Sequence, residues 1–201
     1  MFRLIQSTPL DLEKISECHE KCFANSFSTK AGTAYVKKTL EWFLVAKNRF
    51  LFHIECDNKV IGYCGGFKSA YPGDGSTSGM LQYAMKEAIT GVMKKPYLLF
   101  HPELIKRYPL IFRNLFKKIL SSKKPNSHPL QYHNSPSNSV IGLVVIGVHP
   151  DYRGKGYFEL LMQHFEGECK KRNASKAALS VKASNTRAIA AYKKAGWQIA
   201  S

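Results

Sequence analysis

The fold is decided by residues 140–172, which read VIGLVVIGVHPDYRGKGYFELLMQHFEGECKKR. The first nine residues are almost wholly apolar and mostly β-branched, a composition that predicts a strand buried on both faces. A glycine-rich turn follows, and apolar residues then recur at helical spacing, at Phe158, Leu161, Met162, Phe165 and Cys169. The stretch therefore predicts a buried strand, a basic glycine-rich turn and an amphipathic helix in direct succession.

The glycine-rich turn has the composition of an anion-binding site. The first N–H groups of a helix lack intrahelical partners and carry partial positive charge. Gly154 and Gly156 allow a ligand to approach the backbone closely, and Arg153 and Lys155 add two cations beside the same turn. The pattern matches neither the phosphate-binding P-loop nor the dinucleotide motif GxGxxG. The turn suits a pyrophosphate group held outside those two motifs.

The chain after this helix is expected to add a strand, a helix and the start of another strand. AALSVKA (177–183) is strand-like, and Asn185 is placed to cap a helix that runs through Tyr192. Gly196 suits the C′ position at the end of that helix. WQIAS (197–201) then predicts the beginning of a further strand.

The N-terminal third predicts strands and helices that alternate. The expected elements are a strand at 2–6, helices over 9–22 and 33–47, and strands at 50–56 and 59–68. Asp57-Asn58 between the last two strands indicates a hairpin turn. Gly65-Gly66 indicates a bulge or a close backbone approach in the returning strand.

Residues 70–138 are predicted to form a helical and loop insertion. We expect a loop at 70–80, a helix at 81–95, short helices that begin at Pro102 and Pro109, and a polar connector at 121–139. The basic stretch 109–124 carries an apolar stripe. Three interpretations stay open for it: a lid or buttress packed on the domain, a dock for an anionic acceptor, and a membrane-surface helix.

The composition is that of a globular protein, with 44% hydrophobic and 22% charged residues among 201. This excludes a fully disordered chain and a fibrous repeat, and the length corresponds to one domain over residues 1–201. No apolar run approaches the ~18 residues that span a bilayer, and the first apolar stretch is too short for a signal peptide. A cytoplasmic protein is therefore expected.

The five cysteines predict reduced, buried thiols. They contain no Cys-x-x-Cys pair, and the seven histidines have no zinc-ligand spacing. An odd number of cysteines cannot all pair within one chain. We therefore expect a reducing compartment and no metal site.

The charge of the chain is strongly positive and unevenly distributed. Lys and Arg number 30 against 14 Asp and Glu, a formal charge of +16. Residues 81–150 hold ten bases and two acids, and residues 151–201 hold ten bases and four acids. The excess suggests a polyanionic partner: cofactor phosphates, nucleic acid or an anionic surface. No aromatic-basic RNA motif or helix-turn-helix pattern is present, so no specific nucleic-acid partner is expected, and weak contact with anionic surfaces stays open.

The order of these motifs resembles the GNAT superfamily of acyl-CoA-dependent N-acyltransferases. The family signature Arg/Gln-x-x-Gly-x-Gly/Ala corresponds to Arg153, Gly156 and Phe158, and a second pattern corresponds to Asn185, Ala188, Tyr192, Gly196 and Trp197. The resemblance covers residues 140–197. Phe158 replaces the usual small residue, and the 70–138 insertion is longer than usual. The family normally continues into a strand hairpin where this sequence stops.

The resemblance implies a single GNAT-like α/β domain. Its mixed central sheet would have splayed central strands, flanking helices and the helical insertion. It also implies that acetyl-CoA binds at the splay. The backbone of Ile146, Gly147 and Val148 would bond the pantetheine arm, and the loop that begins at Arg153 would hold the pyrophosphate through the amides of Gly154, Lys155, Gly156, Tyr157 and Phe158. Asn185 is either a plain helix cap or a ligand of the cofactor arm, and both roles are compatible.

The resemblance also favours Tyr192 as the catalytic acid. A phenol with a pKa of ~10 can donate a hydrogen bond to a thiolate whose acid has a pKa of ~8.5. A general base is not evident, because the buried strand contains no carboxylate. His53, Glu55, His149 and a water chain are the alternatives.

The implied reaction is direct transfer of an acetyl or short acyl group from acetyl-CoA to a primary amine. The preferred acceptor is a small-molecule or sugar-linked amine, and the insertion is the place where its identity would be set. Two alternatives stay open: a protein amino-group acetyltransferase, and a non-catalytic module that binds or senses acyl-CoA. The sequence does not determine the acyl length or the oligomeric state.

Overall fold

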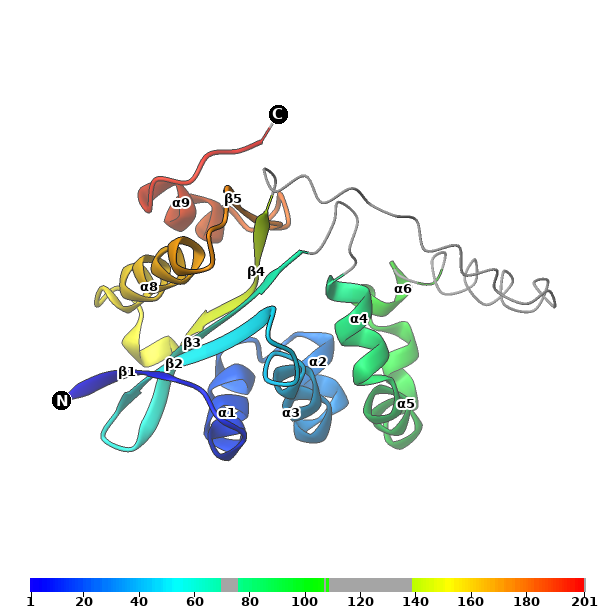
Figure 1. Cartoon of the computed structure of the whole chain (residues 1–201). Coiled ribbons are helices and arrows are strands. Elements are labelled where there is room, and N and C mark those ends of the chain that lie inside the picture. Colours follow the sequence, from blue (N-terminus) through cyan, green and yellow to red (C-terminus); the bar gives the residue numbers. More distant parts are fainter. Residues whose placement is uncertain (70–75, 107, 109–138, 201) are drawn as a thin grey trace.

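One five-stranded sheet organises the chain (Figure 1). The computed structural model describes residues 1–69, 76–106, 108 and 139–200. The strands lie in chain order: β1 (Phe2–Gln6), β2 (Arg49–Cys56), β3 (Lys59–Lys68), β4 (Val140–Val148) and β5 (Lys176–Leu179). The first four strands pair antiparallel, and β4 pairs parallel with β5. The predicted mixed sheet is therefore confirmed.

Helices cover both faces of the sheet (Figure 1). One face carries α1 (Leu12–Cys22), preceded by the 3₁₀ turn η1 (Pro9–Asp11), together with α2 (Phe27–Ala31) and α3 (Thr33–Glu41). The other face carries α8 (Tyr157–Lys171), which follows the turn η3 (Pro150–Tyr152), and α9 (Thr186–Lys194). Because successive strand residues point to opposite faces, each face has its own apolar core. Phe52 and Ile54 pack with Phe165 on the α8 face, and Leu51 packs with Ile15 on the α1 face.

The β2–β3 hairpin has both features that its sequence indicates. Asp57 and Asn58 have φ angles of 48° and 62°, the pair of left-handed residues that a type I′ turn requires. The register against β4 shifts between Gly65 and Gly66, so the predicted bulge is confirmed. A side chain on Gly66 would overlap the rings beneath it on the α8 face. Glycine is needed here because the sheet lies directly on aromatic side chains.

The strands β4 and β5 separate after a short parallel pairing. The paired register runs from Val140↔Lys176 to Leu143↔Leu179, and β5 then ends while β4 continues to Val148. Among the described residues, no strand pairs with residues 144–148 of β4 on this side, which we call the open edge of β4. The expectation that β4 is buried on both faces is wrong for Val140, Gly142 and residues 144–146, which are only partly buried.

Several element boundaries differ from the sequence-based expectation. The helix expected over 33–47 ends at Glu41, and the turn that follows buries both Trp42 and Phe43. Residues 197–200 lie in no strand, contrary to the prediction. The preceding helix closes through a Schellman motif instead: the Trp197 N–H donates to the Tyr192 carbonyl, and Gly196 has a φ angle of 85°.

The insertion packs as helices against α2 and α3 (Figure 1). Its described elements are α4 (Ser76–Tyr83), α5 (Met85–Lys94), η2 (Pro96–Phe100) and α6 (Pro102–Ile105). Residues 76–80 are thus helical where a loop was expected, and the helix expected over 81–95 divides at Ala84, which is fully buried. The predictions for 109–138, including the three interpretations of 109–124, lie outside the described residues. No helix in the described part of the chain is long and apolar enough to cross a membrane.

Replacement of Gly91 by alanine is expected to destabilise the protein by about 1–3 kcal/mol. A methyl group at Gly91 would collide with the carbonyl oxygen of Ala31, where α5 crosses α2. At an unobstructed helix position the same change stabilises by about 0.5–1 kcal/mol. Gly167 on α8 is the matched control, because a methyl group there meets nothing within 4 Å. Urea unfolding checks the prediction, which requires that the two variants shift in opposite directions.

Candidate functional site

The open edge of β4 presents backbone hydrogen-bonding groups. The His149 N–H donates to the Ile61 carbonyl oxygen at 2.8 Å, which fixes this pair as a hydrogen-bonded one. Alternation along the antiparallel ladder then directs the backbone of Gly147 to β3, and the backbone of Ile146 and Val148 to the open side. A ligand that enters beside β4 therefore meets the N–H and C=O groups of Ile146 and the N–H of Val148, whose carbonyl oxygen accepts from Arg153.

The turn at 153–156 is open and contains unpaired donors. Gly154 and Gly156 have φ angles of 76° and 84°, and a Cβ atom on either would meet nothing within 4 Å. The helix begins at Tyr157, so the N–H groups of Tyr157 and Phe158 have no carbonyl in a preceding turn. Lys155 is exposed, with its Nζ 5.2 Å from the centre of a neighbouring tyrosine ring. Free N–H groups, open space and a cation fit the phosphates of coenzyme A.

Arg153 turns away from this anion-binding turn. Its Nε donates to the Val148 carbonyl oxygen at 3.0 Å, and its Nη2 donates to the Cys22 carbonyl oxygen at 3.3 Å. The guanidinium thus joins the end of β4 to the end of α1. The Val148 carbonyl, which the sequence assigns to the pantetheine arm, is engaged by Arg153 in this structure.

An aromatic wall lies beside the turn on the α8 face. The rings of Phe158 and Tyr192 meet edge to face at 5.6 Å, and Trp197 lies 6.3 Å from Tyr192. Burial raises the pKa of Tyr192 to about 12, and neighbouring Cys64 adds to the shift. Among the described residues the Tyr192 hydroxyl has no hydrogen-bond partner. The predicted catalytic phenol is therefore protonated and available to donate.

Asn185 caps α9, as its sequence position predicts. Its side-chain oxygen accepts from the Ala188 N–H at 3.2 Å. The oxygen is thereby engaged, and the amide nitrogen is the group left to meet a ligand. The helix-cap role of Asn185 is confirmed, and a ligand role is compatible with it.

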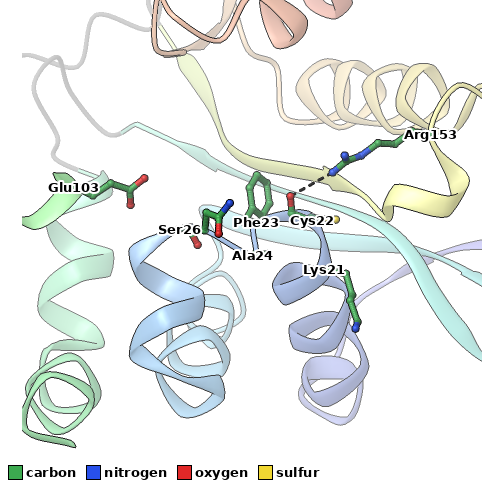
Figure 2. A pocket seen from close by; sticks show the side chains of 8 residues that line it. Lys21, Cys22, Phe23, Ala24, Ser26, Glu103 and Arg153 are labelled. Carbon is green, nitrogen blue, oxygen red and sulfur yellow. Dashed lines mark hydrogen bonds between the residues drawn. The ribbon is translucent and has the colours of Figure 1, made fainter. Parts of the chain in front are cut away.

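A cavity of about 420 Å³ lies on the other face of the sheet, between the ends of α1, α2 and α6 (Figure 2). Its lining comes from the last residues of α1 and the segment that joins α1 to α2, with one residue each from α6 and the glycine-rich turn: Lys21, Cys22, Phe23, Ala24, Asn25, Ser26, Glu103 and Arg153. Figure 2 shows Glu103 and Arg153 at opposite sides of this cavity. The cavity thus reaches from the insertion to the end of β4.

Two thiols meet at the edge of the cavity. The Sγ atoms of Cys18 and Cys22 are 3.9 Å apart, and all five cysteines of the chain are free. The hydrogen bond between the thiols lowers the pKa of Cys22 against the effect of burial, and nearby Arg153 lowers it further. The same hydrogen bond and burial raise the pKa of Cys18. Cys22, expected only to be a buried thiol, is therefore the more readily ionised member of the pair.

A buried hydrogen-bonded chain extends inward from the cavity wall. Ser26 lines the cavity, and its hydroxyl is 2.8 Å from that of Ser28, which lies 2.9 Å from His19 Nε2. His19 Nδ1 is 2.6 Å from the hydroxyl of Tyr63 on β3. Burial lowers the pKa of His19 to about 4, so its ring is neutral at physiological pH. The chain anchors the segment between α1 and α2 to the sheet.

The three side chains considered as general bases do not line the cavity. Glu55 pairs with Arg3 and Lys14 at 3.3 and 3.2 Å. His53 is buried and lies 2.8 Å from a serine hydroxyl, and His149 accepts from the N–H of Asp151 in the turn after β4. Each has a structural partner of its own.

The open edge of β4 connects the two faces of the site. The glycine-rich turn and the aromatic wall lie on the α8 face, and the cavity lies on the α1 face. Arg153 joins the two, because it lines the cavity and bonds the carbonyl oxygen of Val148 at the end of β4. The sequence motifs identified the first face, but the cavity wall from Cys22 to Ser26 was missed because no family motif covers it. One feature of the sequence could have drawn attention to Glu103: it is one of only two acidic residues within 81–150.

Comparison with known proteins agrees with this geometry. Residues 124–197 match the model of the acetyltransferase (GNAT) family. No curated protein matches the chain in sequence. The solved structures that match share its fold at low sequence identity. One is an aminoglycoside N-acetyltransferase in complex with CoA, with a TM-score of 0.61 and 11% identity; the match covers 100% of this chain and 90% of that one.

Two further structures have the same fold. An aminoglycoside 6′-N-acetyltransferase from Acinetobacter haemolyticus has a TM-score of 0.59 and 12% identity, over 99% of this chain and 92% of that one. A possible acetyltransferase from Clostridium difficile has a TM-score of 0.60 and 11% identity, over 100% and 93%. The motif region and the fold thus agree with the resemblance noted in the sequence. The chain therefore has the fold of GNAT acetyltransferases, and its residues 124–197 match the model of that family.

Proposed function

We propose that the protein transfers an acetyl group from acetyl-CoA directly to a primary amine of a small-molecule acceptor. The observation that supports this most strongly is the open edge of β4. It lies between a turn suited to phosphates on one face of the sheet and a cavity of about 420 Å³ on the other. A donor and an acceptor can be bound together there, so no acyl-enzyme intermediate is needed.

On the donor side, the residues proposed from the sequence divide into three groups. The backbone groups of Ile146 and the N–H of Val148 face the open edge and would bond the pantetheine arm, whereas the backbone of Gly147, also expected to bond the arm, is directed to β3. The amides of residues 154–158 would hold the pyrophosphate. Arg153 would fix the position of this loop through its hydrogen bond to the carbonyl oxygen at the end of β4. The amide nitrogen of Asn185 would reach the arm from α9.

On the acceptor side, the cavity volume of about 420 Å³ is in the range of small-molecule sites. Two of the structural neighbours are aminoglycoside acetyltransferases, which makes a sugar-linked amine the leading class. A thiol-release assay with acetyl-CoA and a panel of amines tests the proposal. If acetyl-CoA binds but none of the amines in the panel causes thiol release, the result would favour a module that only binds the cofactor.

Replacement of Gly156 by valine is expected to weaken CoA binding at least tenfold, about 1.4 kcal/mol. Gly156 has a φ angle of 84°, which a β-branched residue adopts only with strain, and a side chain would fill the space meant for phosphate. Gly196→Val is the control, because it meets the same strain at a φ angle of 85° outside the turn. Calorimetry with CoA checks the prediction, and unchanged affinity in a folded Gly156 variant contradicts it.

A further inference from the structure

Glu103 is an ionised carboxylate that faces the cavity. Its two oxygens accept from the Lys182 Nζ at 3.0 Å and from the Phe27 N–H at 3.2 Å. Burial raises the pKa of Glu103, but these two donors outweigh it, and the net shift is downward. Glu103 is the only acidic residue among the described residues that line the cavity.

The partner of Glu103 is held weakly. The side chain of Lys182 is 67% exposed, and that of Glu103 is 35% exposed. Solvent-exposed ion pairs contribute little to stability, so another ammonium group can replace Lys182 at little cost. The N–H of Phe27 would keep the carboxylate in place during such an exchange.

We propose that Glu103 binds a second, non-reacting ammonium group of the acceptor, so that preferred acceptors carry at least two amino groups. This inference rests on the proposed amine acetylation. The reacting amine must be neutral to attack, and a carboxylate beside it would hold it in the charged form. Glu103 therefore suits an ammonium group that stays charged throughout the reaction.

The cations around the cavity fit this orientation. Arg153 lies at the side of the cavity opposite Glu103, next to the end of β4 (Figure 2). A fixed cation lowers the pKa of an amine near it, which favours the neutral nucleophile at the β4 end. Lys21, the other cation of the lining, points away from Glu103 in Figure 2. The cavity thus stabilises a charged amine at one end and a neutral amine at the other.

The test measures binding of linear diamines of three to eight carbons and of the monoamines of equal length, by calorimetry without acetyl-CoA. Wild type should bind the best diamine at least tenfold more tightly than its monoamine. Glu103→Gln, which keeps an oxygen for the Phe27 N–H, should abolish this difference. Lys182→Met should tighten diamine binding severalfold, because it removes the internal competitor.

Lys194→Met is the matched control, since it breaks an ion pair of similar exposure with Glu159, at 3.1 Å, outside the cavity. It should leave diamine affinity unchanged. If Glu103→Gln and Lys182→Met both weaken diamine binding, the pair is only structural and the inference is overturned. Equal affinity of wild type for diamines and monoamines also overturns it. Diamine binding that requires Glu103, without thiol release from acetyl-CoA, would retain Glu103 as an ammonium-binding residue and refute the proposed function.

Discussion

Replacement of Tyr192 by phenylalanine is expected to lower kcat about 10²-fold and to leave CoA affinity within twofold. The change removes one oxygen and keeps the ring, so the edge-to-face contact with Phe158 at 5.6 Å survives. The loss should appear in kcat because the sulfur gains negative charge only as the thioester bond breaks. The proposed role of the hydroxyl is to donate a hydrogen bond to that sulfur.

The burial of Tyr192 sets the size and the pH dependence of this effect. With a pKa of about 12, the phenol is a much weaker acid than a thiol of pKa ~8.5. Full proton transfer to the thiolate is therefore unfavourable, and a hydrogen bond is the larger contribution. We place the effect at the low end of the 10²–10⁴-fold range for acid catalysts for this reason. The pH profile of kcat should show no inflection from Tyr192 below about pH 11.

The measurement is kcat at saturating acetyl-CoA with the best amine of the panel. Tyr97→Phe serves as the control. Tyr97 lies in the insertion, its side chain is 62% exposed, and it is distant in sequence from the residues of the aromatic wall. Its kcat should equal that of wild type. A Tyr192→Phe variant within twofold of wild type would remove the phenol from the mechanism.

Prediction from sequence worked best where backbone constraints are local. The turn at Asp57-Asn58, the bulge at Gly65-Gly66 and the cap at Asn185 each follow from residue types that suit one backbone geometry. The long apolar strand and the helix after the glycine-rich turn were predictable because their periodicity spans many residues. These elements also carry the family motifs, so the fold followed from them.

Contacts between distant segments were not predictable in the same way. Arg153 was expected at the phosphates because of its place in a motif, and only the structure shows its guanidinium bonded to the carbonyls of Val148 and Cys22. Glu103 meets Lys182 across 79 positions of sequence, and no local pattern encodes that meeting. The cavity proposed for the acceptor is made of such contacts, which explains why the sequence motifs described only the face proposed for the donor.

The buried His19 predicts that the protein loses stability as the pH falls from about 6.5 to about 4. The ring is 8% exposed and lies between the hydroxyls of Tyr63 and Ser28. Its pKa is about 4 in the folded protein, against 6.5 for an unperturbed histidine. Below pH 6.5 the unfolded chain therefore binds a proton that the folded protein does not, and this favours unfolding.

The expected loss is near zero at pH 7, about 2 kcal/mol at pH 5 and about 3 kcal/mol at pH 4, and it levels off below pH 4 as the folded protein also becomes protonated. Urea unfolding of wild type and His19→Gln across this range isolates the contribution, because the other titrating groups are common to both. The variant should be less stable at pH 7, since it loses part of the hydrogen-bonded chain, but its stability should fall less steeply as the pH is lowered.

His164→Gln is the control. Burial lowers the pKa of this partly exposed ring as well, and its removal should flatten the pH profile of stability less. Parallel profiles for wild type and His19→Gln would show that His19 is protonated equally in both states. The segment between α1 and α2, which forms the cavity wall, would then have no acid-sensitive anchor at this residue.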